Sequence, residues 1–582
     1  MRLIAILCML GASVGALADD LAAARAVFER NLAAIRNRDR DAYLALYLKS
    51  DRLVRTGPTG FLTGYEEFAK GAGGNWPDTI EATDMRLTPL RPGMVYGSYR
   101  YRVRYGAEEH SGISERVFIE TPEGWRIALT GAVETPPGTP PTPRAITGVT
   151  LIDGRGGAPV PNATVLIRDG KIDCAGTCSV PEGVDVVDGK GLWMTPGLID
   201  AHVHFSQTGW ADGRPDALDV REQYPYEKTI ASLRAHPEVY AKSYLCSGVT
   251  GVFDVGGYSW TTDLAKRFAN DTAAPHVSAA GPLLSTLDFW LNLPAERQFI
   301  HLKDAAAARE GVAYLAAQGA SAIKVWYIEP NEAAINAAGA EAAKAGLPLI
   351  VHATELAGAK VAVRAGAKLL VHSVGDAPVD DEFIKLLKER GTILTPTLTV
   401  VRGYLLMYES AANDTPVAID DPNRCVDDAT RAKMAITPSL TTKANIARFT
   451  ERIAKDEAIE SANLKRLVAA GIPIATGTDA GNPLTLHGPS IYAEMEAMQR
   501  GGMTPMQVIV ASTATAARAA RLDAVTGTIE KGKSADLLLL GGDPAKDVAA
   551  FRKLRHVVRA GVVRGVEELS AMARNPQPSP QP

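Results

Sequence analysis

The sequence has 582 residues, which is too long for one ordinary domain and predicts two or three. Hydrophobic residues make up 46% of the chain and charged residues 22%, a composition typical of globular proteins and unlike that of disordered or fibrous chains. The formal net charge is only −4, so no strong field attracts polyanions, and we expect no nucleic-acid partner.

The first residues predict an export signal. Arg2 is followed by an apolar run from Leu3 to Leu17, and Ala16-Leu17-Ala18 fits a small-x-small cleavage site. The alternative is an N-terminal membrane anchor, but the run is shorter than the roughly 20 apolar residues that span a bilayer. We therefore expect residues 1–18 to be a cleaved signal peptide and the mature protein to be secreted or periplasmic, with no membrane attachment.

Residues 20–135 predict a small α+β domain. Apolar residues recur at helical spacing over 27–35, and Tyr99–Tyr105 alternates with arginine in the period of a strand. A hairpin is expected around Pro122–Gly124. The arginines of the strand could line an anion pocket, but a solvated sheet face is favoured: Arg100, Arg102 and Arg104. This order of elements resembles the NTF2-like, SnoaL-type cone fold.

The segment 136–145 is rich in proline and predicts a stiff linker, while residues 566–582 are expected to form a disordered tail. Cys174 and Cys178 are close enough to pair across a tight turn, and no further ligands nearby suggest a zinc site. A local disulfide is slightly favoured over two free thiols, and both options stay open.

The long central segment, 196–517, alternates short apolar runs with alanine-rich helical patterns, which predicts an α/β fold with a parallel sheet. Helices are expected at Asp304–Gln318 and Asn331–Ala345. Strands are expected at Gly248–Asp254, Ala322–Trp326, Leu347–His352, Lys368–His372, Thr392–Thr397 and Ile472–Thr478. A (β/α)8 TIM barrel is the natural closure over this length, with an open doubly wound sheet as the runner-up. The β-rich pieces 146–195 and 518–565 should join in one small sandwich beside the barrel.

Metal-binding residue types stand where the predicted strands end. His202 and His204 are two residues apart on a strand and therefore face the same way. Lys324 lies in a β-rich run, and three further strands end in His352, His372 and Asp479. Because strand ends converge on the active site of a TIM barrel, this set favours a metal site over isolated core histidines.

Several motifs resemble the amidohydrolase superfamily, and specifically its zinc-dependent Xaa-Pro dipeptidases and amidases. They are Pro196–His204, Gly248–Thr250, the lone Lys324, His352, His372, Gly477–Gly481 and Gly527–Leu537. The resemblance implies two divalent metal ions, zinc by expectation. His202, His204 and Asp479 would bind one ion, and His352 and His372 the other. Lys324 would be carboxylated on its amine (N6-carboxylysine) and bridge both.

Amide hydrolysis is the reaction that this arrangement predicts. A hydroxide held between the metals would attack the carbonyl of a dipeptide or N-acyl amino acid, and Asp479 would transfer the proton. The alternatives are a mononuclear cyclic amidohydrolase similar to imidazolonepropionase, a lactonase or phosphotriesterase, and a ligand-binding protein with an inactive barrel.

Residues that contact the substrate are harder to predict. Trp326 and Tyr327 follow Lys324 and are candidates for the pocket wall, as is His487 after the last metal strand, although packing roles are open for all three. The expected partner is a small-molecule substrate. The oligomeric state stays open, with a homo-oligomer as one option.

Overall fold

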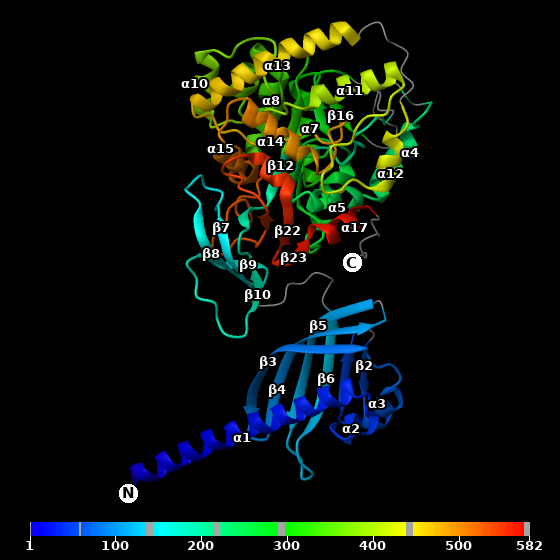
Figure 1. Cartoon of the computed structure of the whole chain (residues 1–582), viewed down its shortest axis with the longest axis vertical. Helices are drawn as coiled ribbons and strands as arrows, with labels where there is room; N and C mark the ends of the chain where they lie inside the picture. The colour runs from blue at the N-terminus through cyan, green and yellow to red at the C-terminus, as the bar shows by residue number, and fades with distance from the viewer. Residues whose placement is uncertain are drawn as a thin grey trace. The chain divides into compact units, whose positions relative to one another are not determined.

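The computed structural model describes residues 2–57, 60–106, 108–134, 144–212, 220, 222–288, 297–437 and 446–574. The chain forms two compact units, Met1–Thr139 and Pro140–Pro582 (Figure 1). Most of the predicted linker, residues 136–143, lies outside the described residues, as does the end of the predicted tail, residues 575–582.

The N-terminal unit is a six-stranded sheet with three helices. The strands are ordered β2-β1-β6-β5-β4-β3, and the long strands β3 to β6 pair antiparallel. The bounds are α1 Arg2–Arg36, α2 Arg40–Leu44, β1 Val54–Gly57, β2 Gly60–Thr63, α3 Tyr65–Gly71, β3 Thr79–Arg91, β4 Met94–Tyr105, β5 Glu108–Ile119 and β6 Arg126–Glu134. The predicted α+β order and the closing hairpin β5–β6 are confirmed.

Helix α1 shows why this unit folds. Val27, Phe28 and Leu32 are buried against the sheet, so the predicted amphipathic stripe faces the core. The helix begins at Arg2, and the predicted signal cleavage after Ala18 stays a prediction. Among the described residues, no helix is both long and apolar enough to span a membrane.

The second unit carries a mixed sheet built from both ends of its sequence. Its path is β23-β22-β21-β11-β7-β8-β9, and β10 pairs with β7. The bounds are β7 Arg144–Leu151, β8 Val160–Arg168, β9 Lys171–Gly176, β10 Asp185–Asp188, β11 Trp193–Pro196, β21 Leu537–Leu540, β22 Leu554–Arg559 and β23 Val562–Gly565. The two predicted flanking pieces therefore join, through β11–β21, in one eight-stranded sheet.

Nine parallel strands form two further sheets, β12-β13-β14 and β16-β15-β17-β18-β19-β20. Their bounds are β12 Leu198–Val203, β13 Val249–Asp254, β14 His276–Ala279, β15 Leu283–Ser285, β16 Phe299–His301, β17 Ile323–Trp326, β18 Leu349–His352, β19 Ala367–Val371 and β20 Ile393–Thr395. Five of the six predicted strands are thus present, and each is buried as a parallel strand should be.

The sixth predicted strand, Ile472–Thr478, is wrong as a regular strand. This segment forms one isolated bridge, Leu394 with Ile474, and a second follows just after it, Val203 with Ala480. Its backbone nevertheless bonds to both sheets, because Ala475 N donates to Leu394 O while Ala201 N donates to Thr476 O. At the other edges, Ser321 N donates to Ala279 O. The two sheets are thus linked by single hydrogen bonds, without one continuous ladder.

Helices surround these strands (Figure 1). They are α4 Tyr226–Ala235, α5 Glu238–Cys246, α6 Leu264–Arg267, α7 Ala305–Ala317, α8 Glu332–Lys344, α9 Leu356–Arg364, α10 Asp381–Arg390, α11 Val400–Asn413, α12 Asp428–Met434, α13 Ile446–Ala469, α14 Ser490–Arg500, α15 Pro505–Val510, α16 Ala516–Ala519 and α17 Val566–Arg574. The predictions for α7 and α8 are confirmed, and Asp304 and Asn331 cap their N-termini as side-chain acceptors.

Helix α17 corrects the predicted tail. Residues 566–574 were expected to be disordered, yet they form an amphipathic helix whose Leu569 and Ala573 are buried. Ser570 Oγ also donates to the carbonyl oxygen of Arg424. The apolar spacing of Leu569 and Ala573, rather than the proline-rich end of the chain, governs this segment.

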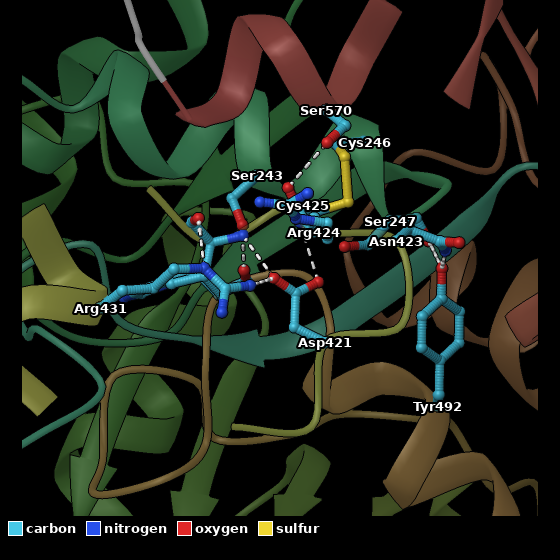
Figure 2. The surroundings of a disulfide bond; sticks show 12 residues. Ser243, Cys246, Ser247, Asp421, Asn423, Arg424, Cys425, Arg431, Tyr492 and Ser570 are labelled. Carbon is cyan, nitrogen blue, oxygen red and sulfur yellow. Dashed lines mark hydrogen bonds and ion pairs between the residues drawn. A yellow bond between two sulfur atoms is a disulfide. The ribbon is translucent and has the colours of Figure 1, made fainter. Parts of the chain in front are cut away.

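The described part of the chain contains two disulfides. Cys174 pairs with Cys178, the option favoured from the sequence, and Cys246 pairs with Cys425 across a separation of 179 residues. Figure 2 shows the second bond, which joins the end of α5 to the loop before α12. In that loop Asp421 accepts hydrogen bonds from the backbone N–H groups of Cys425 and Val426.

Candidate metal centre

The six predicted metal-binding side chains line one cavity of about 270 Å³. Four come from the carboxyl ends of parallel strands, Asp479 comes from the bridging segment, and Lys324 lies inside a strand. They are His202 and His204 at the end of β12, Lys324 in β17, His352 at the end of β18, His372 directly after β19, and Asp479 in the segment between the two sheets.

Asp479 lies at the centre of the histidines. Its Oδ1 is 3.2 Å from His202 Nε2 and 2.9 Å from His204 Nε2, while its Oδ2 is 3.9 Å from His372 Nε2. The rings of His372 and His352 are 4.3 Å apart between centroids. The four imidazoles and the carboxylate therefore form one continuous cluster.

Two of these residues are held in a backbone conformation that is uncommon for side-chain-bearing residues. The φ angles of His372 and Asp479 are 74° and 59°, in the left-handed region. Hydrogen bonds hold both in place: His372 N donates to Thr395 O, and Asp479 N donates to His202 O. Strain of this kind concentrates at functional sites, where the surrounding structure maintains it.

Burial favours the neutral forms of three of the histidines and of Lys324. It lowers the pKa of His202 and His352 well below the ordinary value, and that of His372 to about 4. Burial likewise lowers the pKa of Lys324 to about 7. Although burial alone would raise the pKa of Asp479, the neighbouring histidines lower it well below its usual range. Neutral imidazoles and an ionised carboxylate are the forms that bind metal.

The donor set fits a divalent cation. One nitrogen of His202, one of His204 and a carboxylate oxygen of Asp479 lie within 4.8 Å of one another, and all three residues are buried. Asp479 Oδ1 is buried with no hydrogen-bond partner, although two imidazole nitrogens face it. A buried carboxylate oxygen without a donor is costly, so a cation between these atoms would compensate it.

Neighbouring groups orient the rings. His204 Nδ1 lies 2.6 Å from Gly256 O, and His372 Nδ1 lies 2.7 Å from Thr397 Oγ1. These contacts leave both Nε2 atoms facing the cavity. Asp200 accepts hydrogen bonds from the Thr478 hydroxyl and backbone N–H, which fastens β12 to the segment that carries Asp479. Asp200 thus positions the site from behind, as orienting partners of metal ligands do.

Of the three predicted substrate contacts, the structure brings one to the cavity. Trp326 lines it, with its ring 5.8 Å from that of His352. Tyr327 is buried elsewhere, and its hydroxyl accepts a hydrogen bond from Asn331 N. His487 is stacked on Tyr240 and uses both ring nitrogens on protein partners, so its role is structural.

The cavity also contains side chains that the sequence did not indicate: Gln207, Leu283, Gln298, Phe299, Thr354, Thr397, Val400, Val401, Tyr404, Glu460 and Asn482. Tyr404, on α11, donates to Asn482 Oδ1 at 2.7 Å. Glu460, on α13, has its pKa raised to about 8 by burial and by Asp456. Of these, two carried a signal in the sequence, because Thr397 ends a predicted strand and Asn482 lies three residues after Asp479.

The chain matches known proteins over this region. A family model described as "Amidohydrolase family" matches residues 193–567. Ochratoxinase of Aspergillus niger is 28% identical over 246 residues, which make up 40% of this chain and 42% of that protein. N-acyl-D-aspartate deacylase of Alcaligenes xylosoxydans xylosoxydans is 40% identical over 73 residues, 12% of this chain and 14% of that protein. The chain therefore spans less than half the length of these curated relatives.

Solved structures are similar over a longer range. A Xaa-Pro dipeptidase with bound methionine in the active site has a TM-score of 0.57 at 22% identity, covering 73% of this chain and 100% of that one. The A. niger ochratoxinase structure has a TM-score of 0.57 at 23% identity, covering 75% and 99%. Likeness at this level of identity shows a shared fold.

Proposed function

We propose, from the premise that this chain belongs to the amidohydrolase family, that it is a metal-dependent hydrolase of amide bonds. The observation that carries the proposal is the cavity in which four histidines, Asp479 and Lys324 meet. Separate strand ends supply these groups, as in the active sites of TIM-barrel enzymes.

Two groups of ligands account for two ions. His202, His204 and Asp479 would hold one, and His352 and His372 the other, with Lys324 shared between them. When bound, divalent ions would polarise a substrate carbonyl and lower the pKa of water to about 7. Zinc suits a set dominated by imidazole.

Lys324 is suited to carboxylation. Only the neutral amine reacts with carbon dioxide, forming an N–C bond and releasing one proton, and burial lowers the pKa of Lys324 to about 7. The product is an anion, which would offset part of the charge of two dications. Carboxylation of Lys324 can be tested without an activity assay. When the protein is equilibrated with ¹³C-labelled bicarbonate, the carbamate carbon gives a signal in the ¹³C NMR spectrum.

Asp479 is the proposed proton carrier. It is ionised and lies at the centre of the cluster, so it can accept a proton from the attacking water and deliver it to the leaving nitrogen. Asn482 and Tyr404 stand beside it and would orient the substrate.

The proposed substrates are dipeptides or N-acyl amino acids. The related proteins named as N-acyl-D-aspartate deacylase and Xaa-Pro dipeptidase support this class. The cavity offers both kinds of surface that such molecules need. Leu283, Phe299 and Trp326 are apolar, and Tyr404 and Asn482 are polar.

Three further parts of the proposal concern the barrel, the N-terminal unit and the export of the protein. The parallel strands would close into a (β/α)8 barrel through the bonds of segment 473–480 and of Ser321. The N-terminal unit would be an NTF2-like cone. The first 18 residues would direct export to the periplasm or outside the cell, which is compatible with two disulfides.

A second candidate keeps the fold but uses one ion on a cyclic amide. It is favoured by the compact trio of His202, His204 and Asp479, which could hold one metal alone. Imidazolonepropionase of Idiomarina loihiensis, 38% identical over 79 residues, is a relative of that kind. The number of bound ions separates the two candidates.

A hydrolysis screen tests the main proposal. Purified protein would be assayed on dipeptides, N-acyl amino acids, cyclic amides, lactones and phosphotriesters, before and after chelation and zinc restoration. We expect amide cleavage that is lost on chelation and in His202→Ala, and retained in His236→Ala, an exposed histidine at the end of α4. Activity that survives both chelation and His202→Ala would refute the proposal, and no hydrolysis of any substrate would favour a binding protein.

A further inference from the structure

The N-terminal unit contains a cavity of its own, of about 580 Å³, between its helices and the concave face of its sheet. Several aromatic side chains contribute to its walls. Tyr43 from α2 meets Trp76 edge to face, with ring centroids 5.5 Å apart, and Phe68 from α3 and Tyr101 from β4 line the same space. The volume falls in the range of small-molecule sites, roughly 300–1,000 Å³.

A buried cation lies in this cavity wall. Arg116, on β5, lines the cavity and is 6% exposed. Its Nη2 donates to Tyr99 Oη at 2.9 Å, and its Nη1 donates to Ser114 Oγ at 2.6 Å and to Glu115 O at 3.0 Å. Its Nε–H is buried without a partner.

The partners of Arg116 are all uncharged. Among the residues that the structure describes, no carboxylate forms an ion pair with this guanidinium. The phenol of Tyr43 does not compensate the charge, because burial raises its pKa well above the ordinary value. Arginine cannot lose its proton in a protein, and a buried charge without a counterion is strongly unfavourable. Because Arg116 lines the cavity, this unpaired positive charge favours an anion bound there.

The two exposed arginines of β4, Arg102 and Arg104, do not line this cavity. Arg102 and Arg104, on β4, are exposed and Arg100 is half-buried, so the expected solvated face is confirmed for two of the three arginines. The remaining charged groups in the cavity wall are Arg55, His110 and Glu134, and His110 Nδ1 lies 2.6 Å from Glu134 Oε1. Glu134 therefore pairs with His110 and not with Arg116.

We propose that this cavity binds a small carboxylate with an aromatic or apolar body, the carboxylate on Arg116 and the body against Tyr43, Phe68 and Trp76. A planar carboxylate suits the guanidinium, and the ring faces suit an aromatic group. None of these residues belongs to the cavity that contains His202, so the inference stands apart from the proposed hydrolysis.

Calorimetric titration of the full chain tests the proposal with two probes of similar shape. Phenylacetate carries the charge, and phenylacetone is neutral and cannot be hydrolysed. We expect phenylacetate to bind at least about tenfold more tightly, since hydrogen bonds to charged groups are worth roughly ten- to a hundredfold in affinity. Arg116→Gln should remove that preference, and Arg102→Gln, an exposed arginine on the adjacent strand, should keep it.

The controls make each outcome decisive. Thermal unfolding shows whether Arg116→Gln stays folded. If it does not, Trp76→Ala serves instead, because it leaves the guanidinium in place and should weaken phenylacetate binding about tenfold through lost stacking. Equal affinity for both probes, no heat from phenylacetate at millimolar concentration, or unchanged binding in a folded Arg116→Gln would each overturn the proposal. Binding that Arg102→Gln removes as well would place the ligand elsewhere.

Discussion

The disulfide between Cys246 and Cys425 should contribute more stability than the other disulfide of this unit. A cross-link restricts the unfolded chain according to the length of the loop that it closes. For a separation of 179 residues, the chain-entropy relation gives about 5 kcal/mol at 25 °C, against about 2 kcal/mol for the separation of four between Cys174 and Cys178. The expected difference is therefore about 3 kcal/mol.

Urea unfolding of two double variants measures this difference directly. Cys246→Ala/Cys425→Ala should lower the free energy of unfolding by about 3 kcal/mol more than Cys174→Ala/Cys178→Ala, which serves as the matched control. The native loop should persist in the first variant, because Asn423 Nδ2 donates to Tyr492 Oη and Tyr492 Oη donates to Ser247 O (Figure 2). Equal losses in the two variants, or a larger loss in the control, would refute the loop-length reasoning.

Three further predictions concern the cavity that contains His202 and the buried ion pair of Asp536 with Arg559. Lys324→Met should remove one of two bound metal equivalents and leave the free energy of unfolding little changed. It should lower kcat by more than the roughly 100-fold loss that is typical when a residue supporting a metal ligand is replaced. An unaltered kcat would contradict the proposed role of Lys324 in metal binding. Asp536→Asn should cost about 3–5 kcal/mol in urea unfolding, because it leaves Arg559 buried without its carboxylate at 3.3 Å. Arg559 and His276 hold the pKa of Asp536 well below its usual range despite burial, so its stabilisation is present above about pH 4, the unfolded pKa, and is lost as pH falls through the folded pKa. The free energy of unfolding of the wild type, measured from neutral to acidic pH, should show this loss. If Asp536→Asn lost stability over the same pH range, Asp536 would not be the group responsible.

The sequence predicted which side chains meet in this cavity, because strand ends impose their placement. A histidine at the end of a buried apolar run, as in Leu349–His352, can point only into the space where parallel strands converge. The same logic placed His372 and Asp479 correctly, although their left-handed backbone could not be foreseen from residue type. It failed for the regular pairing of Ile472–Thr478, since a ladder needs neighbours whose register only the tertiary fold fixes.

Other features depend on contacts between distant segments. His487 was a candidate for the cavity by its position after Asp479, but Tyr240 and Tyr244 from α5 enclose it. The pairing of Cys246 with Cys425 joins residues whose separation carries no local signal. Arg116 could not be predicted for the same reason, because its burial depends on the packing of β5 between β4 and β6. The sequence instead drew attention to the arginines of β4, which alternate with apolar residues.

Metal content is the measurement that tests the central claim most directly. Elemental mass spectrometry on protein purified in zinc should give about two ions per chain. We expect His202→Ala and His352→Ala each to lower that number while His236→Ala leaves it unchanged. A chain that binds no metal, or that retains both ions in His202→Ala and His352→Ala, would contradict the conclusion that these strand ends form one metal centre.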